Sequence, residues 1–239
     1  MPNKNLNKLL KYYDHTAEKY DTMHSEIEHE IAIEFILKLI ELYNIDSVLD
    51  IGAGTGSNLI KFKSTRKNLN VVGIEPSRAL ILKAKDKNIK NINLFMAVGE
   101  NIPLKNNSFD AVCEFAMLHH VPDPDKVVSE MIRVAKNAIF ISDSNRFGQG
   151  SILSRYLKLI IYKLRLWKLA NYIKTFGKGY IYSEGDGISY SYSVYDSLNQ
   201  IQDWADRVII IPTSNINSKN WLHPLIGSSH LLLCAFKEN

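Results

Sequence analysis

Three glycines fall within five positions directly after a short apolar segment, and this spacing is typical of a ligand-binding loop. The stretch VLDIGAGTGSN at residues 48–58 contains Gly52, Gly54 and Gly56. A backbone without Cβ atoms turns tightly and lets a ligand lie against it, and the helix expected next offers free N–H groups. Glu75 ends the following apolar segment, where a carboxylate can accept two hydrogen bonds from a ribose diol. The loop and the carboxylate together predict a site for a ribose-bearing ligand.

Two ligands carry such a ribose: a dinucleotide and S-adenosylmethionine. The dinucleotide fingerprint G-x-G-x-x-G/A ends in a small residue that permits close helix packing, and this chain has Ser57 at that position. Asp50, two residues before the first glycine, would repel a pyrophosphate and attract a cationic amino group. The spacing and the charge therefore favour S-adenosylmethionine.

Strand-like and helix-like patterns alternate through the first two thirds of the chain, which predicts an α/β fold with a mostly parallel sheet covered on both faces. The last two apolar segments have no long helix between them, so we expect an antiparallel pair that ends the sheet. Helices are expected at 6–20, 27–43, from about 58, 78–87 and 124–136. Strands are expected at 47–51, 71–75, 93–98, 109–115, 138–142, 207–212 and 230–237.

Four segments together resemble the class I S-adenosylmethionine-dependent methyltransferases that act on small molecules. YYDHTAEKYD at 12–21 resembles the family's helix that lids the cofactor, and VLDIGAGTGSN resembles its glycine-rich loop. VVGIEPS at 71–77 resembles its acidic loop, and GENIPLKNNSFDAVCEFAMLHHV at 99–121 is similar to its fourth conserved stretch. The resemblance implies a Rossmann-like, seven-stranded sheet with a cap-like insertion before the last two strands.

The same resemblance implies which residues bind the cofactor. It places Gly52 and Gly54 at the methionine part, Glu75 at the ribose and Glu114 close to the methyl sulfonium. Val98 stands where the family often has an aspartate, so contacts to the adenine are expected to be mostly backbone and apolar. The predicted cofactor-binding residues are Tyr13, Tyr20, Asp50, Gly52, Ala53, Gly54, Glu75, Pro76, Val98, Gly99, Glu114 and Phe115.

Methyl transfer from a sulfonium is an in-line displacement, so alignment of donor and acceptor at about 3 to 3.5 Å supplies most of the catalysis. A base helps when the acceptor is an ammonium or a hydroxyl. His119, His120 and Asp143 lie where the fourth and fifth expected strands end, and we predict His119 and Asp143 as catalytic residues. The alternative for each is structural: a histidine that holds the VPDPD turn, and an aspartate that caps a turn. No metal ligands are predicted, because two cysteines form no metal motif and clustered carboxylates are missing at the strand ends.

Substrate choice is expected to reside in the insertion between the fifth strand and the last pair. SDSNRFGQGS at 142–151 leaves the fifth strand, and YIYSEGDGISYSYSVYD at 180–196 predicts a hairpin with tyrosines on one face. Such tyrosines would stack on a polar ring such as a sugar, with Glu184 or Asp186 on its amine or hydroxyl. The alternative is a half-exposed strand pair that serves as scaffold. The predicted substrate-binding residues are Asn145, Arg146, Tyr182, Glu184 and Tyr190.

Residues 151–178 carry seven basic residues and no acidic one. A stripe of apolar residues predicts one amphipathic helix there: Leu153, Leu157, Ile160, Leu164 and Trp167. A basic amphipathic helix can lie on an anionic membrane or cover a pocket for an acidic substrate. The alternative is a capping helix with a solvated basic rim.

The chain of 239 residues is long enough for one α/β domain, which we expect to be cytoplasmic because neither an export signal nor a run of eighteen apolar residues is found. We divide it into N-terminal lid helices (1–45), a cofactor-binding core (46–141), a substrate-binding insertion (142–206) and a final strand pair (207–239). The segment EFAM at 114–117 lacks the motif of enzymes that methylate nucleic-acid bases, which disfavours a nucleic-acid substrate. The leading hypothesis is methyl transfer to N or O of a polar small molecule, with a sugar-bearing metabolite as one example. A membrane-borne, lipid-linked acceptor and a non-catalytic cofactor-binding module remain as alternatives.

Overall fold

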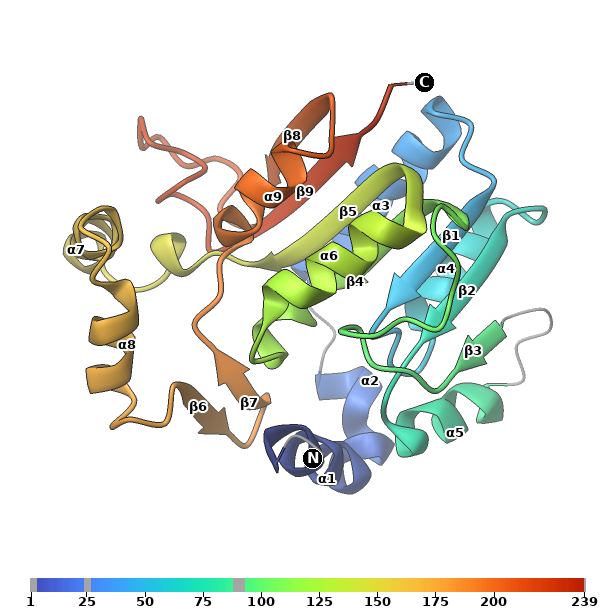
Figure 1. Cartoon of the computed structure of the whole chain (residues 1–239), viewed down its shortest axis with the longest axis horizontal. Coiled ribbons are helices and arrows are strands. Elements are labelled where there is room, and N and C mark those ends of the chain that lie inside the picture. The colour runs from blue at the N-terminus through green and yellow to red at the C-terminus, as the bar shows by residue number, and fades with distance from the viewer. Residues whose placement is uncertain (1–3, 24–26, 88–92, 239) are drawn as a thin grey trace.

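A single sheet of seven strands organises the protein, whose computed structural model describes residues 4–23, 27–87 and 93–238 (Figure 1). The strand order is β3-β2-β1-β4-β5-β9-β8. The first five strands in this order are parallel, and β9 runs antiparallel to both β5 and β8. Their bounds are β1 (Ser47–Ile51), β2 (Asn70–Ile74), β3 (Asn93–Phe95), β4 (Phe109–Phe115), β5 (Ala135–Ser144), β8 (Arg207–Pro212) and β9 (His230–Phe236). The predicted fold class, including the antiparallel final pair, is confirmed.

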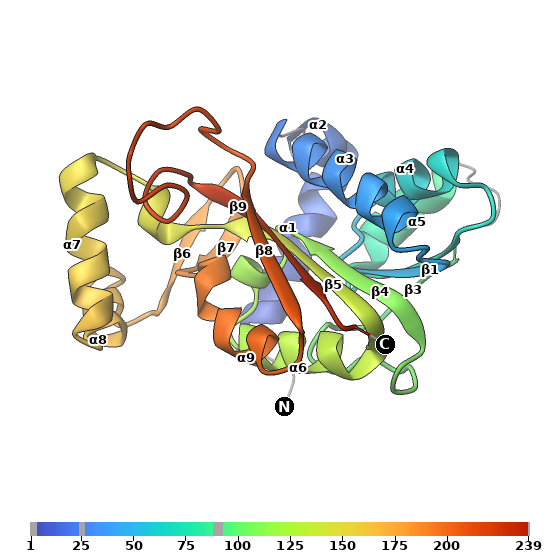
Figure 2. The same ribbon diagram turned by 90° about the horizontal axis from the view of Figure 1, so that it is seen from above.

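Helices cover both faces of the sheet (Figure 2). One face carries α3 (Ile27–Leu42) and α4 (Ser57–Thr65), and the other carries α6 (Pro124–Val134) and α9 (Leu198–Gln202). The inner parallel strands β1, β2, β4 and β5 are largely buried on both faces, so they consist mostly of apolar residues. The helices on the two faces hold the ends of β1, β2 and β4 in place. The candidate site residues follow directly after these strand ends.

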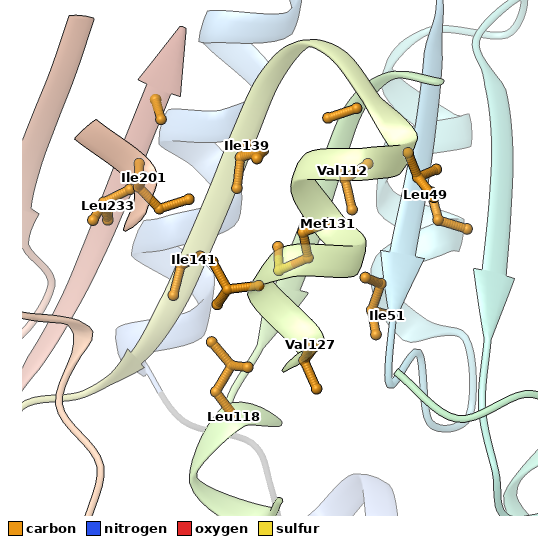
Figure 3. Packing of buried hydrophobic residues seen from close by; sticks show 14 of the residues in the cluster. Leu49, Ile51, Val112, Leu118, Val127, Met131, Ile139, Ile141, Ile201 and Leu233 are labelled. Carbon is orange, nitrogen blue, oxygen red and sulfur yellow. The ribbon is translucent and has the colours of Figure 1, made fainter. Parts of the chain in front are cut away.

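The helix α6 shows how sequence spacing makes this core (Figure 3). Val127 and Met131 lie four residues apart and therefore share the helix face that packs on the sheet, against Val112, Ile139 and Ile141. These side chains are fully buried or nearly so. Burial of each such side chain contributes about 1.5–3 kcal/mol, so the elements that carry the site are rigidly held.

Several predicted boundaries are wrong. The expected helix over 6–20 is divided into α1 (Lys4–Thr16), a 3-10 turn η1 (Ala17–Lys19) and α2 (Tyr20–Met23). The segment after α6 passes directly into β5, which starts at Ala135 and extends to Ser144. β3 ends at Phe95, because the chain turns away after this short edge strand.

The insertion also differs from its prediction as one helix. It forms α7 (Ile152–Lys163) and α8 (Trp167–Lys174), separated by Arg165, whose φ of 61° lies in the left-handed region. A residue in that conformation ends an α-helix, although no glycine or proline marks the break. The expected hairpin is present as β6 (Tyr180–Ser183) and β7 (Gly187–Tyr190). Within the described residues, no helix has the length and apolarity that a bilayer-spanning segment requires.

Candidate active site

A cavity of about 780 Å³ opens beyond the carboxyl ends of β1, β2 and β4. Strand order reverses at this place, because β1 lies between β2 and β4, and open α/β sheets bind ligands at such a point. The cavity brings together most of the predicted cofactor-binding residues, the predicted catalytic residue His119 and the predicted substrate-binding residue Tyr190. Those that line it are Tyr13, Tyr20, Gly52, Ala53, Glu75, Pro76, Val98, Gly99, Phe115, His119 and Tyr190.

The loop after β1 requires glycine at two positions. Gly52 has a φ of 73°, and a Cβ atom there would lie 2.6 Å from Cγ of Met117. Gly54 has a φ of 55°, and a Cβ atom there would lie 3.0 Å from the ring of Tyr20. Positive φ is costly for residues with a side chain, so the sequence pattern reflects both conformation and space.

Glu75 lies at the end of β2 with its carboxylate against this loop. Its Oε2 accepts a hydrogen bond from the amide of Gly54 at 3.0 Å, and its Oε1 accepts one from the amide of Ser77 at 2.8 Å. Burial raises the pKa of Glu75 to about 7, against the effect of these two hydrogen bonds. The carboxylate is therefore fixed in place at the cavity wall, where a ribose diol would supply further donors.

A short lid closes over the loop. Tyr20 of α2 packs edge-on against Tyr13 of α1, with ring centroids 5.8 Å apart. Asp21 forms an ion pair of 2.8 Å with Lys87 and accepts a hydrogen bond from Thr55 of the loop. Lys87 also donates to Thr55 at 2.8 Å. The sequence analysis did not predict these contacts of Asp21 with Thr55 and Lys87, because no sequence pattern links the lid to a lysine in a distant segment.

Three predicted cofactor residues do not line the cavity: Gly54, whose amide bonds to Glu75, and the buried Asp50 and Glu114. Asp50 is buried in β1, and burial raises its pKa to about 8. Glu114 is fully buried at the end of β4, where burial and the charge of Asp143 raise its pKa well above the usual value. Its Oε2 accepts a hydrogen bond from the amide of Met117 at 2.9 Å, so Glu114 supports the turn that follows β4.

The structure brings His119, which follows β4, into contact with Asp143 of β5. Nδ1 of His119 lies 2.7 Å from Oδ1 of Asp143, and the amide of His119 donates to Oδ2 at 3.2 Å. Burial alone would raise the pKa of Asp143, but His119 and nearby donors lower it to about 2. Burial alone would lower the pKa of His119, but Asp143 and Asp186 raise it well above the usual value. Asp143 thus holds Nδ1 of His119, and the other ring nitrogen, Nε2, faces Asp186 at 3.7 Å.

Comparison with known proteins identifies the family. A family described as methyltransferase domain matches residues 49–141. A demethylmenaquinone methyltransferase of Thermotoga maritima is 26% identical over 159 residues, which are 62% of this chain and 69% of that protein. The chain belongs to the class I S-adenosylmethionine-dependent methyltransferases.

Solved methyltransferases share the fold over nearly the whole chain. The magnesium protoporphyrin IX methyltransferase of Synechocystis, with bound S-adenosylhomocysteine, superimposes with a TM-score of 0.63 at 14% identity, covering 99% of this chain and 100% of that one. A possible histamine N-methyltransferase of Thermotoga maritima gives a TM-score of 0.58 at 17% identity, covering 95% and 99%. S-adenosylmethionine is the cofactor of this methyltransferase, and the glycine loop with Glu75 at its cavity fits that ligand.

Four of the five residues predicted to bind the methyltransferase's substrate do not line the main cavity. Asn145 is fully buried, and its amide donates to the carbonyls of Leu225 and Ser228 at 2.7 and 2.8 Å. Arg146 is nearly buried, paired with Asp196 and stacked 4.9 Å from the ring of Trp167. Both residues hold the start of the insertion in place.

The hairpin of the methyltransferase turns its inner strand, and not its tyrosine-rich outer strand, toward the cavity. β7 packs on α1 and on η2 (Leu118–His120), which places Tyr190 at the cavity wall. Tyr182 on β6 is half exposed and lies edge-on to Tyr12, with ring centroids 6.4 Å apart. Glu184 is exposed outside the cavity, and its carbonyl accepts a hydrogen bond from the hydroxyl of Tyr12. Position along the chain could not reveal which strand would face inward.

Two histidines outside the predicted set also line the cavity, His29 of α3 and His230 of β9. Their ring centroids lie 4.9 Å apart. β9 is antiparallel to β5, so its first residue lies beside Ser144 at the carboxyl end of β5. Because the final pair was predicted to be antiparallel, the first residue of its last strand, His230, could have been expected at this edge of the sheet.

Proposed function

We propose that this methyltransferase transfers the methyl group of S-adenosylmethionine to an oxygen or nitrogen of a small molecule bound at the His119 end of the cavity. One observation carries the proposal: Glu75 and the glycine loop line the same cavity as His119. A volume of about 780 Å³ lies within the range of roughly 300–1,000 Å³ typical of ligand pockets, so donor and acceptor have room side by side. This arrangement supports direct transfer between two ligands held together.

The cofactor half of the cavity follows from the residues that line it. Glu75 would accept the ribose hydroxyls, and the backbone at Gly52 and Ala53 would contact the methionine part. Val98 and Gly99 would border the adenine. The bound cofactor supplies an electrophilic methyl group on a sulfonium, so these residues have only to hold it and aim it toward the acceptor.

In its neutral form, His119 would take up the acceptor's proton at Nε2 as the methyl group leaves the sulfonium, which becomes the neutral thioether of S-adenosylhomocysteine. Asp143, bonded to the other ring nitrogen, fixes the orientation of the imidazole and stabilises the imidazolium, the same division of roles as in a Ser-His-Asp triad. Asp143 and Asp186 raise the pKa of His119, which favours the imidazolium that forms, and only the neutral ring can act as the base. Asp186 and Tyr190 line the cavity beside His119 and would bind further polar atoms of the acceptor.

The β6–β7 hairpin bears on the chemical class of the methyl acceptor. Ring stacking between several tyrosines was the basis for expecting a sugar, but only Tyr190 of the predicted pair reaches the cavity. We therefore propose an acceptor recognised mainly by a hydroxyl or amine near His119, with or without a sugar.

Incubation of the protein with methyl-labelled S-adenosylmethionine and fractionated metabolites tests this function. We expect labelled product in fractions that also yield S-adenosylhomocysteine, and at least a hundredfold lower rate for His119→Asn, because positioned acid–base groups contribute about 10²–10⁴-fold. An exposed histidine, His15, gives the matched variant His15→Asn with unchanged rate. Tight binding of S-adenosylhomocysteine without transfer to any fraction would instead favour a non-catalytic binding module.

A second candidate is an acceptor carried by an anionic membrane, and the helix pair α7 and α8 favours it. These two helices stand away from the sheet at one end of the molecule (Figures 1 and 2). They expose apolar side chains at helical spacing, including Leu153 at 77% and Phe176 just after α8 at 92%. Exposed basic residues flank them: Lys163, Arg165, Lys168, Lys174 and Lys178.

The combination of apolar and basic groups matches a lipid surface with negative head groups, because the apolar face enters the interface while the cations pair with the lipid charge. A second cavity of about 210 Å³ extends from His119 and Asp186 to Lys174 of α8. It shares five residues with the main cavity: His119, Ser144, Gln149, Asp186 and Tyr190. An acceptor held at the membrane by a lipid chain would approach His119 along this path.

A further inference from the structure

Three side chains of metal-binding type meet at the acceptor end of the cavity. They are His119 and His120 of η2 and Asp186, in the turn between β6 and β7. One ligand atom of each lies within 4.8 Å of the others. Nε2 of His119 is 3.7 Å from Oδ2 of Asp186, and Nε2 of His120 is 3.4 Å from Oδ1. All three residues line the main cavity.

Nδ1, the ring nitrogen that faces away from Asp186, already has a hydrogen-bond partner in each histidine. Nδ1 of His120 donates to the carbonyl of Ile188 at 2.6 Å, and a carbonyl only accepts. When the ring is neutral, this tautomer leaves the lone pair on Nε2, which faces Asp186. Nδ1 of His119 is held by the carboxylate of Asp143 at 2.7 Å. Histidines that bind metals nearly always have this kind of support, a carboxylate or a carbonyl on the second ring nitrogen.

The separations between the three groups also leave room for a bound cation. At 3.7 Å, His119 and Asp186 are too far apart for a hydrogen bond. A tetrahedral Zn²⁺ with bonds of about 2.0 Å holds its ligand atoms roughly 3.3 Å apart. The distances from the two imidazoles to Asp186, 3.7 Å to Oδ2 and 3.4 Å to Oδ1, are close to that value, and one ligand atom of each residue lies within 4.8 Å of the others.

We propose that His119, His120 and Asp186 form a binding site for a divalent transition cation, with Zn²⁺ as the best match. Two imidazoles and one carboxylate suit Zn²⁺ and disfavour Mg²⁺, which prefers oxygen ligands. Three protein ligands leave one position open toward the cavity, as in catalytic zinc sites. Sequence reasoning predicted no metal ligands, because Asp186 approaches the histidine pair only through the folded hairpin.

The role of this cation rests on the proposed function. At its open position it would bind the acceptor's hydroxyl or amine beside the methyl donor and lower the pKa of a bound hydroxyl, whose proton would pass to water. The oxygen would then form the new bond to the methyl group as the bond from carbon to sulfur breaks and the sulfur keeps the electron pair. With the cation in place, Nε2 of His119 is a ligand, so the cation replaces His119 in activating the acceptor. Asp143 then orients a metal ligand and not a base.

Calorimetric titration of chelator-treated, tag-free protein with Zn²⁺ tests the site. We expect one Zn²⁺ per chain with wild type, and at least tenfold weaker binding for Asp186→Asn and for His120→Ala. The matched variants Asp203→Asn and His15→Ala change an exposed aspartate and an exposed histidine outside the cavity and should bind like wild type. No binding by wild type, or wild-type affinity in both Asp186→Asn and His120→Ala, would overturn the proposal.

Titration of the same samples with S-adenosylhomocysteine separates this proposal from the proposed function. The variants are expected to keep wild-type affinity for this ligand, which also shows that they are folded. If wild type binds S-adenosylhomocysteine but not Zn²⁺, the metal site alone is refuted. If it binds Zn²⁺ through the three residues but not S-adenosylhomocysteine, the site stands and the proposed function fails.

Discussion

The backbone amide of Gly54 donates a hydrogen bond of 3.0 Å to Oε2 of Glu75, although the two residues are 21 positions apart. The bond connects the loop after β1 with the end of β2. It also aims the buried carboxylate at the cavity before any ligand arrives, so binding requires little ordering of side chains. This contact explains why a glycine-rich loop and a carboxylate at the end of the next strand act as one ribose site.

Protonation of Glu75 should control affinity for the cofactor product. Burial raises its pKa to about 7, so the ligand-free protein takes up a proton there as the pH falls below about 7. Ribose hydroxyls donate to the ionised carboxylate, and protonation therefore opposes binding. We expect calorimetry to show that affinity for S-adenosylhomocysteine falls by up to about tenfold per pH unit below this pKa and changes little above it. Glu75→Gln should bind more weakly with a flatter pH profile, and identical profiles for both proteins would refute the role of Glu75.

Substitution of Gly52 by alanine should damage the loop. Its φ of 73° and the approach of Met117 to 2.6 Å leave no place for a Cβ atom. We expect Gly52→Ala to lower the free energy of unfolding by about 1–3 kcal/mol and to weaken binding of S-adenosylhomocysteine at least tenfold. Gly185→Ala is the matched control, because a Cβ atom there meets nothing within 4 Å. Equal denaturant midpoints for both variants would contradict this account of the loop.

Asp143→Asn should destabilise the protein, because it removes the fully buried partner of an ion pair whose other member, His119, is 14% exposed. Loss of one member of a fully buried pair costs about 3–5 kcal/mol, so we expect a loss of up to that size, which denaturant unfolding measures directly. Exposed Asp203→Asn should stay within about 0.5 kcal/mol of wild type. Affinity for S-adenosylhomocysteine should remain nearly unchanged in both, since Asp143 does not line the cavity. Wild-type stability of Asp143→Asn would show that the pair contributes nothing to folding.

Cosedimentation with vesicles tests the membrane-borne acceptor. We expect binding that rises with the fraction of anionic lipid and weakens with salt. Each basic residue near such a surface contributes about 1 kcal/mol, so Lys163→Gln with Lys168→Gln should weaken binding by roughly thirtyfold. The same change at Lys38 and Lys67, exposed residues at the end of α3 and after α4, should have little effect. Absence of binding to anionic vesicles at low salt would remove this candidate.

The cofactor half of the site could be predicted because short stretches of sequence identify its residues. The glycines, Glu75 and the residues near Val98 each follow directly after a strand, and parallel strands bring their carboxyl ends to one edge. The position of His119 beside Asp143 followed from the same rule, applied to β4 and β5.

The acceptor half could not be predicted in this way. Its wall depends on which strand of the insertion hairpin packs against α1 and η2, and the tyrosines of both strands have the same local pattern. Asp186 reaches His119 only because β7 is the inner strand. The apolar stripe of 151–178 was identified, but its exposure depends on the break at Arg165 and on the absence of a covering element among the described residues.

Calorimetric titration of the wild-type protein with S-adenosylhomocysteine, set against the same titration with NAD, tests most directly whether this cavity is a methyl-donor site. We expect one S-adenosylhomocysteine bound per chain, no measurable binding of NAD, and a ten- to hundredfold loss of affinity in Glu75→Ala, since a hydrogen bond to a charged group is worth about 1.5–3 kcal/mol. Tight binding of NAD with none of S-adenosylhomocysteine would contradict the account.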